Sequence, residues 1–164
     1  MKCVKLVMQG NILIKLIILT VILLSIFSCG QKPKQKLIAE FDCAKEYPSG
    51  TYFSHGDVHL ASSVAGLYRE AEAVPLSRFG YRFSVKNIGK PYLAVVRYPD
   101  DKRRFMCVMD GTTYDMTIGV FTGVNQPITN KMLEIRKVFW PRWNDCSIVF
   151  MTWSTGEPAA VSDI

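Results

Sequence analysis

Residues 90–122 decide the fold: KPYLAVVRYPDDKRRFMCVMDGTTYDMTIGVFT. An apolar run at 92–96 is followed by a polar break at 99–102 and by a second apolar run at 105–109. Pro99 fixes φ at the first corner of a turn, and aspartates there can bond their own backbone. The pattern predicts a β-hairpin, and the absence of helical periodicity indicates an antiparallel β domain.

The rest of the chain extends this pattern. Residues 66–73, GLYREAEA, are the one stretch that favours a helix, but Pro75 interrupts it too soon for a stable one. In the segment 132–139, we expect Leu133, Ile135 and Val138 to point inward. Further strands are expected at 51–53, 58–65, 79–86, 114–122, 132–139, 147–153 and 159–164. About seven or eight strands, with turns every 8–12 residues, predict an all-β fold, an antiparallel β-sandwich.

Residues 1–28 have the features of a secretory signal peptide. A basic start precedes an apolar stretch of about twelve residues, too short to span a hydrocarbon core about 30 Å thick. The junction Ile26-Phe27-Ser28-Cys29-Gly30 resembles a bacterial lipobox, in which the cysteine is acylated. We expect lipidation at Cys29 and an exported, membrane-anchored lipoprotein on the periplasmic or cell-surface side. An uncleaved anchor and ordinary secretion are the alternatives, and both also export the domain.

Residues 29–36 form a polar tether, and residues 37–164 form the expected domain. The net charge of +6 arises outside this domain, because six of the 20 basic residues precede Leu37 and the other fourteen balance fourteen acidic residues. We therefore expect no nucleic-acid partner. The segment 159–164 begins another strand at the end of the sequence, so we expect the last strand to be incomplete and the reading frame to continue.

Three cysteines, Cys43, Cys107 and Cys146, follow Cys29 in the expected mature chain. An exported compartment permits disulfides, but an odd number leaves at least one thiol unpaired, and the sequence does not choose a pairing. Cys107 and Cys146 lie in or beside apolar runs, which favours burial of one or both as small hydrophobic residues. No two cysteines have the spacing of zinc ligands.

From Gly66 onward, several segments resemble, in order, a module of large exported bacterial proteins for polysaccharide breakdown. The matching segments are GLYREAEA (66–73), SRFGYRFSV (77–85), PYLAVVRYPDDKRR (91–104), GVFTG (119–123), FWPRWNDCSIVFMTW (139–153) and GEPAAVSDI (156–164). The resemblance implies a galactose-binding-type jelly roll that stands ahead of a glycosidase-like catalytic domain. It also implies carbohydrate binding or a structural accessory role. The catalytic domain is absent from this sequence, so we do not expect the activity of full-length relatives.

Carbohydrate binding requires flat aromatic faces for the C–H side of a pyranose, with carboxylates, amides and guanidinium groups around them for the hydroxyls. Trp140 and Trp143 are the main candidates, because they lie in an expected loop. As an alternative, they plug and cap one end of the sandwich, and Trp153 belongs to the core. The remaining candidates are Arg142, Asn144, Asp145, Tyr114, Asp100, Asp101 and Arg103, with Asp115 and Thr122 as neighbours of Tyr114.

For the residues 100–104, the alternative to a binding role is a solvated turn with weak surface ion pairs. His55, Asp57 and His59 invite a metal interpretation, but no fourth ligand or helix fixes them, and zinc is not expected. A structural calcium ion is common in jelly-roll sugar modules, although no Asp-rich loop identifies one here.

Catalytic motifs are largely missing from the sequence. It contains no G-x-S-x-G, P-loop or H-E-x-x-H pattern, and the one close pair of acids, Asp100 and Asp101, lies in a predicted turn. We therefore expect a non-catalytic, lipid-anchored carbohydrate-binding or accessory module that meets a polysaccharide or oligosaccharide. The alternatives are a purely structural domain that packs on a glycoside hydrolase-like partner, and a glycosidase-related enzyme fragment.

Overall fold

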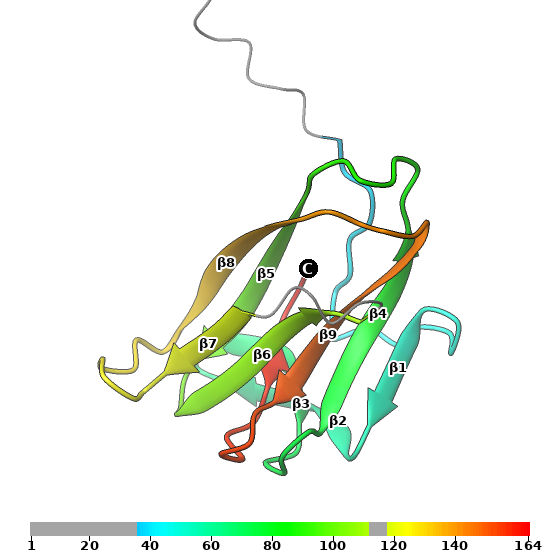
Figure 1. Cartoon of the computed structure of the whole chain (residues 1–164). Helices are drawn as coiled ribbons and strands as arrows, with labels where there is room; N and C mark the ends of the chain where they lie inside the picture. The colour runs from blue at the N-terminus through cyan, green and yellow to red at the C-terminus, as the bar shows by residue number, and fades with distance from the viewer. Residues whose placement is uncertain (1–35, 112–117) are drawn as a thin grey trace, which may run out of the picture. The chain divides into compact units, whose positions relative to one another are not determined.

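The computed structural model describes residues 36–111 and 118–164 (Figure 1). Every described strand belongs to the unit Leu37–Ile164. The described residues form ten strands and no helix. The strands are β1 Tyr52–His55, β2 Val58–Ser63, β3 Gly66–Ala71, β4 Arg78–Ser84, β5 Tyr92–Asp100, β6 Arg104–Asp110, β7 Ile118–Thr122, β8 Lys131–Phe139, β9 Asp145–Thr152 and β10 Ala160–Val161.

Five strands form one antiparallel sheet in the order β1-β4-β9-β6-β7. In Figure 1 this sheet extends across the front of the domain, from β7 at the left to β1 at the right. Strands β6 and β9 have neighbours on both sides, and nearly all of their residues are buried. Their sequences are therefore almost continuously apolar, without the alternation of a half-exposed strand.

The second layer is built from a three-stranded sheet, β10-β3-β2, and a two-stranded sheet, β5-β8. Residues 162–164 continue from β10 and join the two sheets. The Arg97 N–H donates to the carbonyl of Asp163 at 2.9 Å, and the Ser162 N–H donates to the carbonyl of Arg97 at 2.8 Å. Phe41 and Ile164 exchange two further backbone hydrogen bonds of 3.0 Å. The layers together form an antiparallel β-sandwich, which confirms the predicted fold class.

The core lies between the inner faces of the two layers. In the sequence of β4, apolar Tyr81 and Phe83 alternate with polar Arg82 and Ser84. Phe79 and Tyr81 are accordingly fully buried, whereas Arg82 is exposed. The ring of Phe41 stacks on that of Tyr81, with centroids 4.9 Å apart. Other buried side chains of this core are Val96, Met106, Val108, Val120, Ile148, Phe150 and Val161.

The predicted hairpin between residues 92 and 109 is wrong. Strand β5 pairs along its whole length with β8, whereas β6 pairs with β7 and β9 in the other sheet. Pro99 is not in a turn: it lies in β5 opposite Met132 and is fully buried. The polar break therefore carries the chain from one layer to the other. The two edges of β6 are occupied by β7 and β9, so β5 is not its neighbour.

Tertiary packing also decides two local features. Residues 66–71, whose types favour a helix, form strand β3 because β2 and β10 pair with it on either side. Val138 was expected to point inward, but it is exposed. Its neighbour Phe139 packs against the core. Because successive side chains of a strand point to opposite faces, Val138 points away from the core.

The three cysteines of the domain are free and buried. The predicted burial of Cys107 and Cys146 is therefore confirmed. Burial raises the pKa of the Cys146 thiol to about 11 and that of the Cys43 thiol to about 12. At neutral pH these thiols are protonated and inert, as expected for small core residues.

Candidate functional site

The loop between β8 and β9 is fastened to the connection between β4 and β5. Pro141 is fully buried, and its carbonyl accepts a hydrogen bond of 2.8 Å from the Gly89 N–H. The Asn144 carbonyl accepts a bond of 2.8 Å from the Val85 N–H, and the Asn144 side-chain amide donates to the Val85 carbonyl at 3.1 Å. These contacts hold both ends of the segment that carries Trp140 and Trp143.

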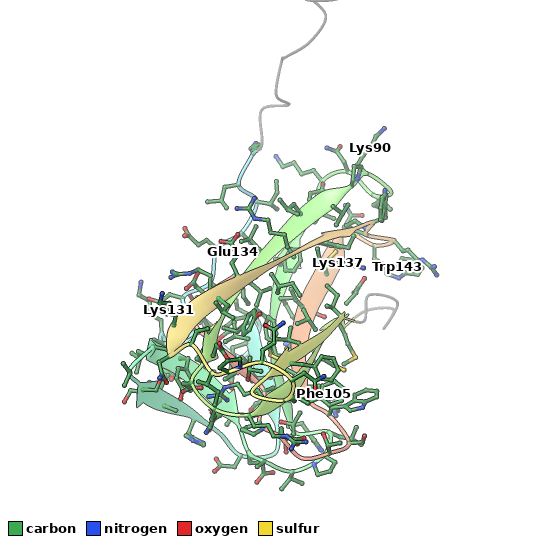
Figure 2. All side chains as sticks on the ribbon, turned by 90° about the vertical axis from the view of Figure 1, so that its left-hand side faces the viewer. Lys90, Phe105, Lys131, Glu134, Lys137 and Trp143 are labelled. Atoms are coloured by element: carbon green, nitrogen blue, oxygen red, sulfur yellow. The ribbon has the colours of Figure 1, made fainter. Side chains whose placement is uncertain are left out.

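Trp140 and Trp143 are nevertheless open to solvent, with exposed fractions of 59% and 60%. Figure 2 shows Trp143 at the outer margin of the domain. The alternative in which these two rings plug and cap the sandwich is therefore wrong. The buried Pro141 closes this part of the core instead. Trp153, by contrast, is half-buried and packs against a small apolar cluster on the outer face of the five-stranded sheet.

Three exposed polar residues accompany the tryptophans. Arg142 lies between them in the chain, and Asn144 and Asp145 follow directly. The Asp145 carboxylate accepts a hydrogen bond of 3.0 Å from the Ser84 hydroxyl. Aromatic faces with a guanidinium, an amide and a carboxylate beside them form the set of groups that binds the apolar face and the hydroxyls of a sugar.

A shallow depression of about 870 Å³ begins at Asp145 and extends over the outer face of β9, β4 and β1. Its walls are mainly polar. Phe53 supplies an aromatic ring in it, and the guanidinium of Arg82 lies 4.4 Å from the centroid of that ring. The full lining is Gly50, Thr51, Phe53, Ser54, His55, Arg78, Arg82, Phe83, Ser84, Gly111, Asp145, Cys146 and Ser147.

Phe53 and Arg82 are not among the candidate residues predicted from the sequence. The alternation in β4 places Arg82 on the outer face, so the position of Arg82 could be predicted from the sequence. The position of Phe53 could not be predicted, because it depends on the pairing of β1 with β4. That pairing sets Phe53 opposite Gly80, where a Cβ atom would stand only 2.7 Å from the Phe53 ring.

The structure separates the predicted site into two groups. Along β5 and β8, Tyr92 pairs with Phe139 at one end and Asp100 pairs with Lys131 at the other. Eight residues of extended chain span about 26 Å. The Trp140–Asp145 loop and the Asp100–Arg103 segment therefore lie at opposite ends of the sandwich, as the two connections at upper right and lower left of Figure 1 show.

The interpretation of residues 100–104 as a solvated turn is wrong for Asp100 and Arg104, which are buried, whereas Lys102 and Arg103 are exposed. Asp100 is buried and accepts hydrogen bonds from the Thr129 N–H at 2.8 Å and the Thr129 hydroxyl at 2.7 Å. Asp101 accepts one of 2.6 Å from the Tyr68 hydroxyl. Among the predicted residues of this segment, Arg103 alone is exposed, and it pairs with Glu157 at 2.8 Å.

Arg104 lies at the centre of this buried polar cluster, with a side chain only 2% exposed. It donates to Glu70 at 2.6 Å and twice to Asp101, at 3.0 and 2.8 Å. Burial alone would raise the pKa of the Asp101 carboxyl, but the hydrogen bonds from Tyr68 and Arg104 outweigh it and lower that pKa. Burial and the bond to Asp101 raise the pKa of Tyr68 to about 12. These groups join β3 to β6 and are fully engaged within the fold.

Three residues named from the sequence, Cys29, Tyr114 and Asp115, lie outside the described ranges. His55 ends β1 and His59 lies in β2, which belongs to the other layer, and the one close contact is 4.0 Å between His59 and Asp57. Within residues 36–111 and 118–164, no three His, Cys, Asp or Glu side chains group to hold a metal ion. No helix in those ranges is long and apolar enough to cross a membrane.

The fold is shared with solved carbohydrate-binding modules. A family 35 carbohydrate-binding module from Clostridium thermocellum superposes with a TM-score of 0.54 and 11% identity, over 77% of this chain and 96% of that one. A family 35 module from an environmental isolate superposes with a TM-score of 0.55 and 16% identity, over 77% and 90% of the two chains. The galactose-binding-like β-sandwich implied by the sequence is therefore confirmed as a fold. No protein-family model and no curated protein sequence matches the chain.

Proposed function

We propose that this chain is a non-catalytic carbohydrate-binding module and that Trp140 and Trp143 provide its main binding surface. The observation that carries this proposal is the exposure of about three fifths of both indoles in a loop tied down by hydrogen bonds. A free aromatic side chain in a mobile loop would lose conformational entropy on binding. A loop that is already ordered loses less, so more of the stacking energy contributes to affinity.

The polar residues of the loop supply the specificity in this proposal. Arg142 and Asn144 offer N–H donors, and Asp145 offers acceptors, for the hydroxyl groups of a pyranose stacked on an indole. The adjoining depression gives room for further sugar residues over β9 and β4, where Arg82 and Ser147 add donors. A binding surface that continues beyond the tryptophans suits a polysaccharide better than a free monosaccharide.

The fold shared with carbohydrate-binding modules supports the proposed ligand class. The engagement of the buried carboxylates inside the domain supports a non-catalytic function. Asp100, Asp101 and Glu70 are each engaged by hydrogen bonds or ion pairs inside the domain, so they do not offer a free acid and base to one glycosidic bond. The rival enzyme function requires turnover of a chromogenic glycoside that is lost when one specific acid is changed.

The proposal includes export and anchoring through an acylated Cys29, with residues 30–36 as the tether. In this role the module would hold a polysaccharide close to the membrane and to a catalytic partner. Metabolic labelling with a radioactive fatty acid, lost in Cys29→Ser, tests the anchor. A structural calcium ion stays a prediction, and a thermal-unfolding midpoint that falls on chelation would reveal it.

Retention of the full chain in native gels that contain a panel of soluble polysaccharides tests the binding function. The chain should be retarded by at least one of them, and Trp140→Ala/Trp143→Ala should weaken that retention at least tenfold, about 1.4 kcal/mol. Val64→Ala, an exposed apolar residue between β2 and β3, is the matched control. Retention by no polysaccharide, or equal retention of the double variant, would overturn the proposal.

A further inference from the structure

Three aromatic rings stand side by side on the five-stranded sheet, apart from the tryptophan loop. The centroids of Phe105 and Phe121 are 4.0 Å apart with their planes at 34°, and those of Phe105 and Trp153 are 5.8 Å apart at 42°. Phe105 is therefore the middle ring. We call this group the aromatic stack. Among the described residues, the rings of Phe105 and Phe121 are closer than those of any other aromatic pair, the next being Phe41 and Tyr81 at 4.9 Å.

The register of three strands produces the stack. Phe105 of β6 is directly opposite Phe121 of β7, and the Trp153 N–H donates to the Phe105 carbonyl at 3.2 Å, which continues β9 alongside β6. Arg104 and Met106 point into the sandwich, so Phe105 points to the outer face. Gly119 leaves the space that the rings need, because a Cβ atom there would come within 2.8 Å of Phe121.

The stack offers an apolar surface to solvent. Phe121 is 57% exposed, while Phe105 and Trp153 are half-buried. Single exposed apolar residues are ordinary on protein surfaces, but three contiguous rings form a patch of the kind that marks a binding site. Because the rings already contact one another, they are fixed before any ligand arrives.

Charged groups border the stack on one side. Arg103 lies two residues before Phe105 on the same outer side of the chain, and its guanidinium pairs with Glu157 at 2.8 Å. A hydrogen bond from Thr155, helped by the charge of Arg103, lowers the pKa of Glu157, so the carboxylate is ionised at neutral pH. The Glu157 side chain is only 17% exposed and holds the Arg103 guanidinium, whose own side chain is 62% exposed. An aromatic surface beside an exposed guanidinium offers a stacking face for the C–H side of a pyranose and N–H donors for its hydroxyls.

The stack is distant from the tryptophan loop. From Asp145 to Trp153 the chain runs eight residues along β9, which corresponds to about 26 Å. In Figure 2, Phe105 and Trp143 accordingly lie in separate regions of the domain. No single short oligosaccharide can occupy both surfaces.

We propose that the aromatic stack is a second carbohydrate-binding site, which takes a pyranose of a polysaccharide on Phe121 with Arg103 at its hydroxyls. This inference rests on the proposed function, since it assigns a second site for the same class of ligand. Two sites on one rigid domain bind a long chain with greater apparent affinity than either site alone, because the second contact is intramolecular. Oligosaccharides shorter than the separation gain nothing from the second site.

The three tryptophans allow the sites to be observed separately. In the full chain with Trp140→Phe and Trp143→Phe, solubilised in a detergent without a sugar head group, Trp153 is the remaining indole. Its emission should change on titration with a polysaccharide that retains the wild type, and Phe121→Ala should abolish the change. In native gels, Phe121→Ala should weaken retention by the polysaccharide at least fivefold and leave binding of a trisaccharide at the loop unchanged.

Each outcome decides between the two proposals. Constant Trp153 emission, with unchanged retention of Phe121→Ala, overturns the second site while the loop function stands. Retention that survives Trp140→Ala/Trp143→Ala but is lost in Phe121→Ala overturns the loop function and supports the stack. A wild type that sediments as a dimer, and a Phe121→Ala variant that sediments as a monomer, would make the occupant a second copy of the chain and overturn the proposal. Val64→Ala again serves as the control.

Discussion

Replacement of Arg104 with alanine is expected to lower the free energy of unfolding by about 3 kcal/mol. The Arg104 guanidinium is almost completely buried and donates hydrogen bonds to Glu70, to Asp101 and, at 3.3 Å, to the carbonyl of Pro158. The variant would leave two buried carboxylates without their shared cation. This perturbation tests whether the cluster holds β3 against β6.

The size of this loss in unfolding free energy depends on which partners Glu70 and Asp101 keep in the variant. Loss of one partner of a buried ion pair costs about 3–5 kcal/mol, because the other charge stays desolvated. Here the lower end applies, since Lys102 still reaches Glu70 at 2.8 Å and the Tyr68 hydroxyl still donates to Asp101 at 2.6 Å. A domain typically has a total stability of about 5–15 kcal/mol, so the variant would lose a large share of it.

Equilibrium unfolding in urea measures this difference. Arg136→Ala is the matched control, because Arg136 pairs with Glu134 at 2.6 Å on the exposed side of β8, where an ion pair contributes at most about 1 kcal/mol. The dependence of free energy on urea should stay the same for all three proteins if unfolding is cooperative. A loss below about 1 kcal/mol for Arg104→Ala would refute the view that this cluster joins the two layers.

Three further outcomes follow from the structure. The hydrogen bonds that Asp101 accepts outweigh the effect of its burial and hold its pKa below the value of about 3.9 in the unfolded chain. The ionised Asp101 carboxylate therefore stabilises the folded domain above about pH 4, and this contribution is lost as the pH falls through the folded-state pKa. The free energies of unfolding of wild type and Asp101→Asn should converge towards pH 3, and a gap independent of pH would contradict this. Cys43 and Cys146 should resist a thiol reagent until urea unfolds the domain, and peptide mapping that finds them labelled in the native protein would count against their burial. Gly80→Ala should cost about 1–3 kcal/mol in urea unfolding, since its Cβ would stand 2.5 Å from the Ile148 carbonyl oxygen, whereas Gly50→Ala, with open space around it, should be neutral.

The sequence predicted where most strands lie because their local signals are strong. Alternation identified β4, and apolar runs identified β6 and β9. It did not predict the partner of each strand. The choice between a hairpin and a crossing to the other layer at residues 99–103 depends on β8, which lies some thirty residues further along the chain. Such long-range pairing leaves no signature in the local pattern.

The candidate site, like the fold, was predictable where the local sequence carries the signal and not where distant segments meet. The loop from Trp140 to Asp145 was found because its residue types are unusual for a turn. The Asp100–Arg104 segment was misjudged because adjacent charges suggest solvent exposure, whereas their partners Glu70 and Thr129 approach from distant parts of the chain. The aromatic stack was missed because Phe105, Phe121 and Trp153 converge only through strand register.

The structure also separates residues that stabilise the fold from those proposed to bind. The ion pairs with the least exposure, around Arg104, lie inside the sandwich, while Trp143 and Phe121 are exposed on its surface. Truncation of the exposed Trp143 ring removes little buried area, so Trp143→Ala should change the free energy of unfolding by less than about 0.5 kcal/mol. Phe121→Ala also removes the contact with the Phe105 ring, so it should cost about 0.5–1.5 kcal/mol. A loss of polysaccharide retention in either variant would then report on contact with the ligand. A large accompanying loss of stability would instead show that the ring is part of the fold, and would remove the basis for assigning it to a binding surface.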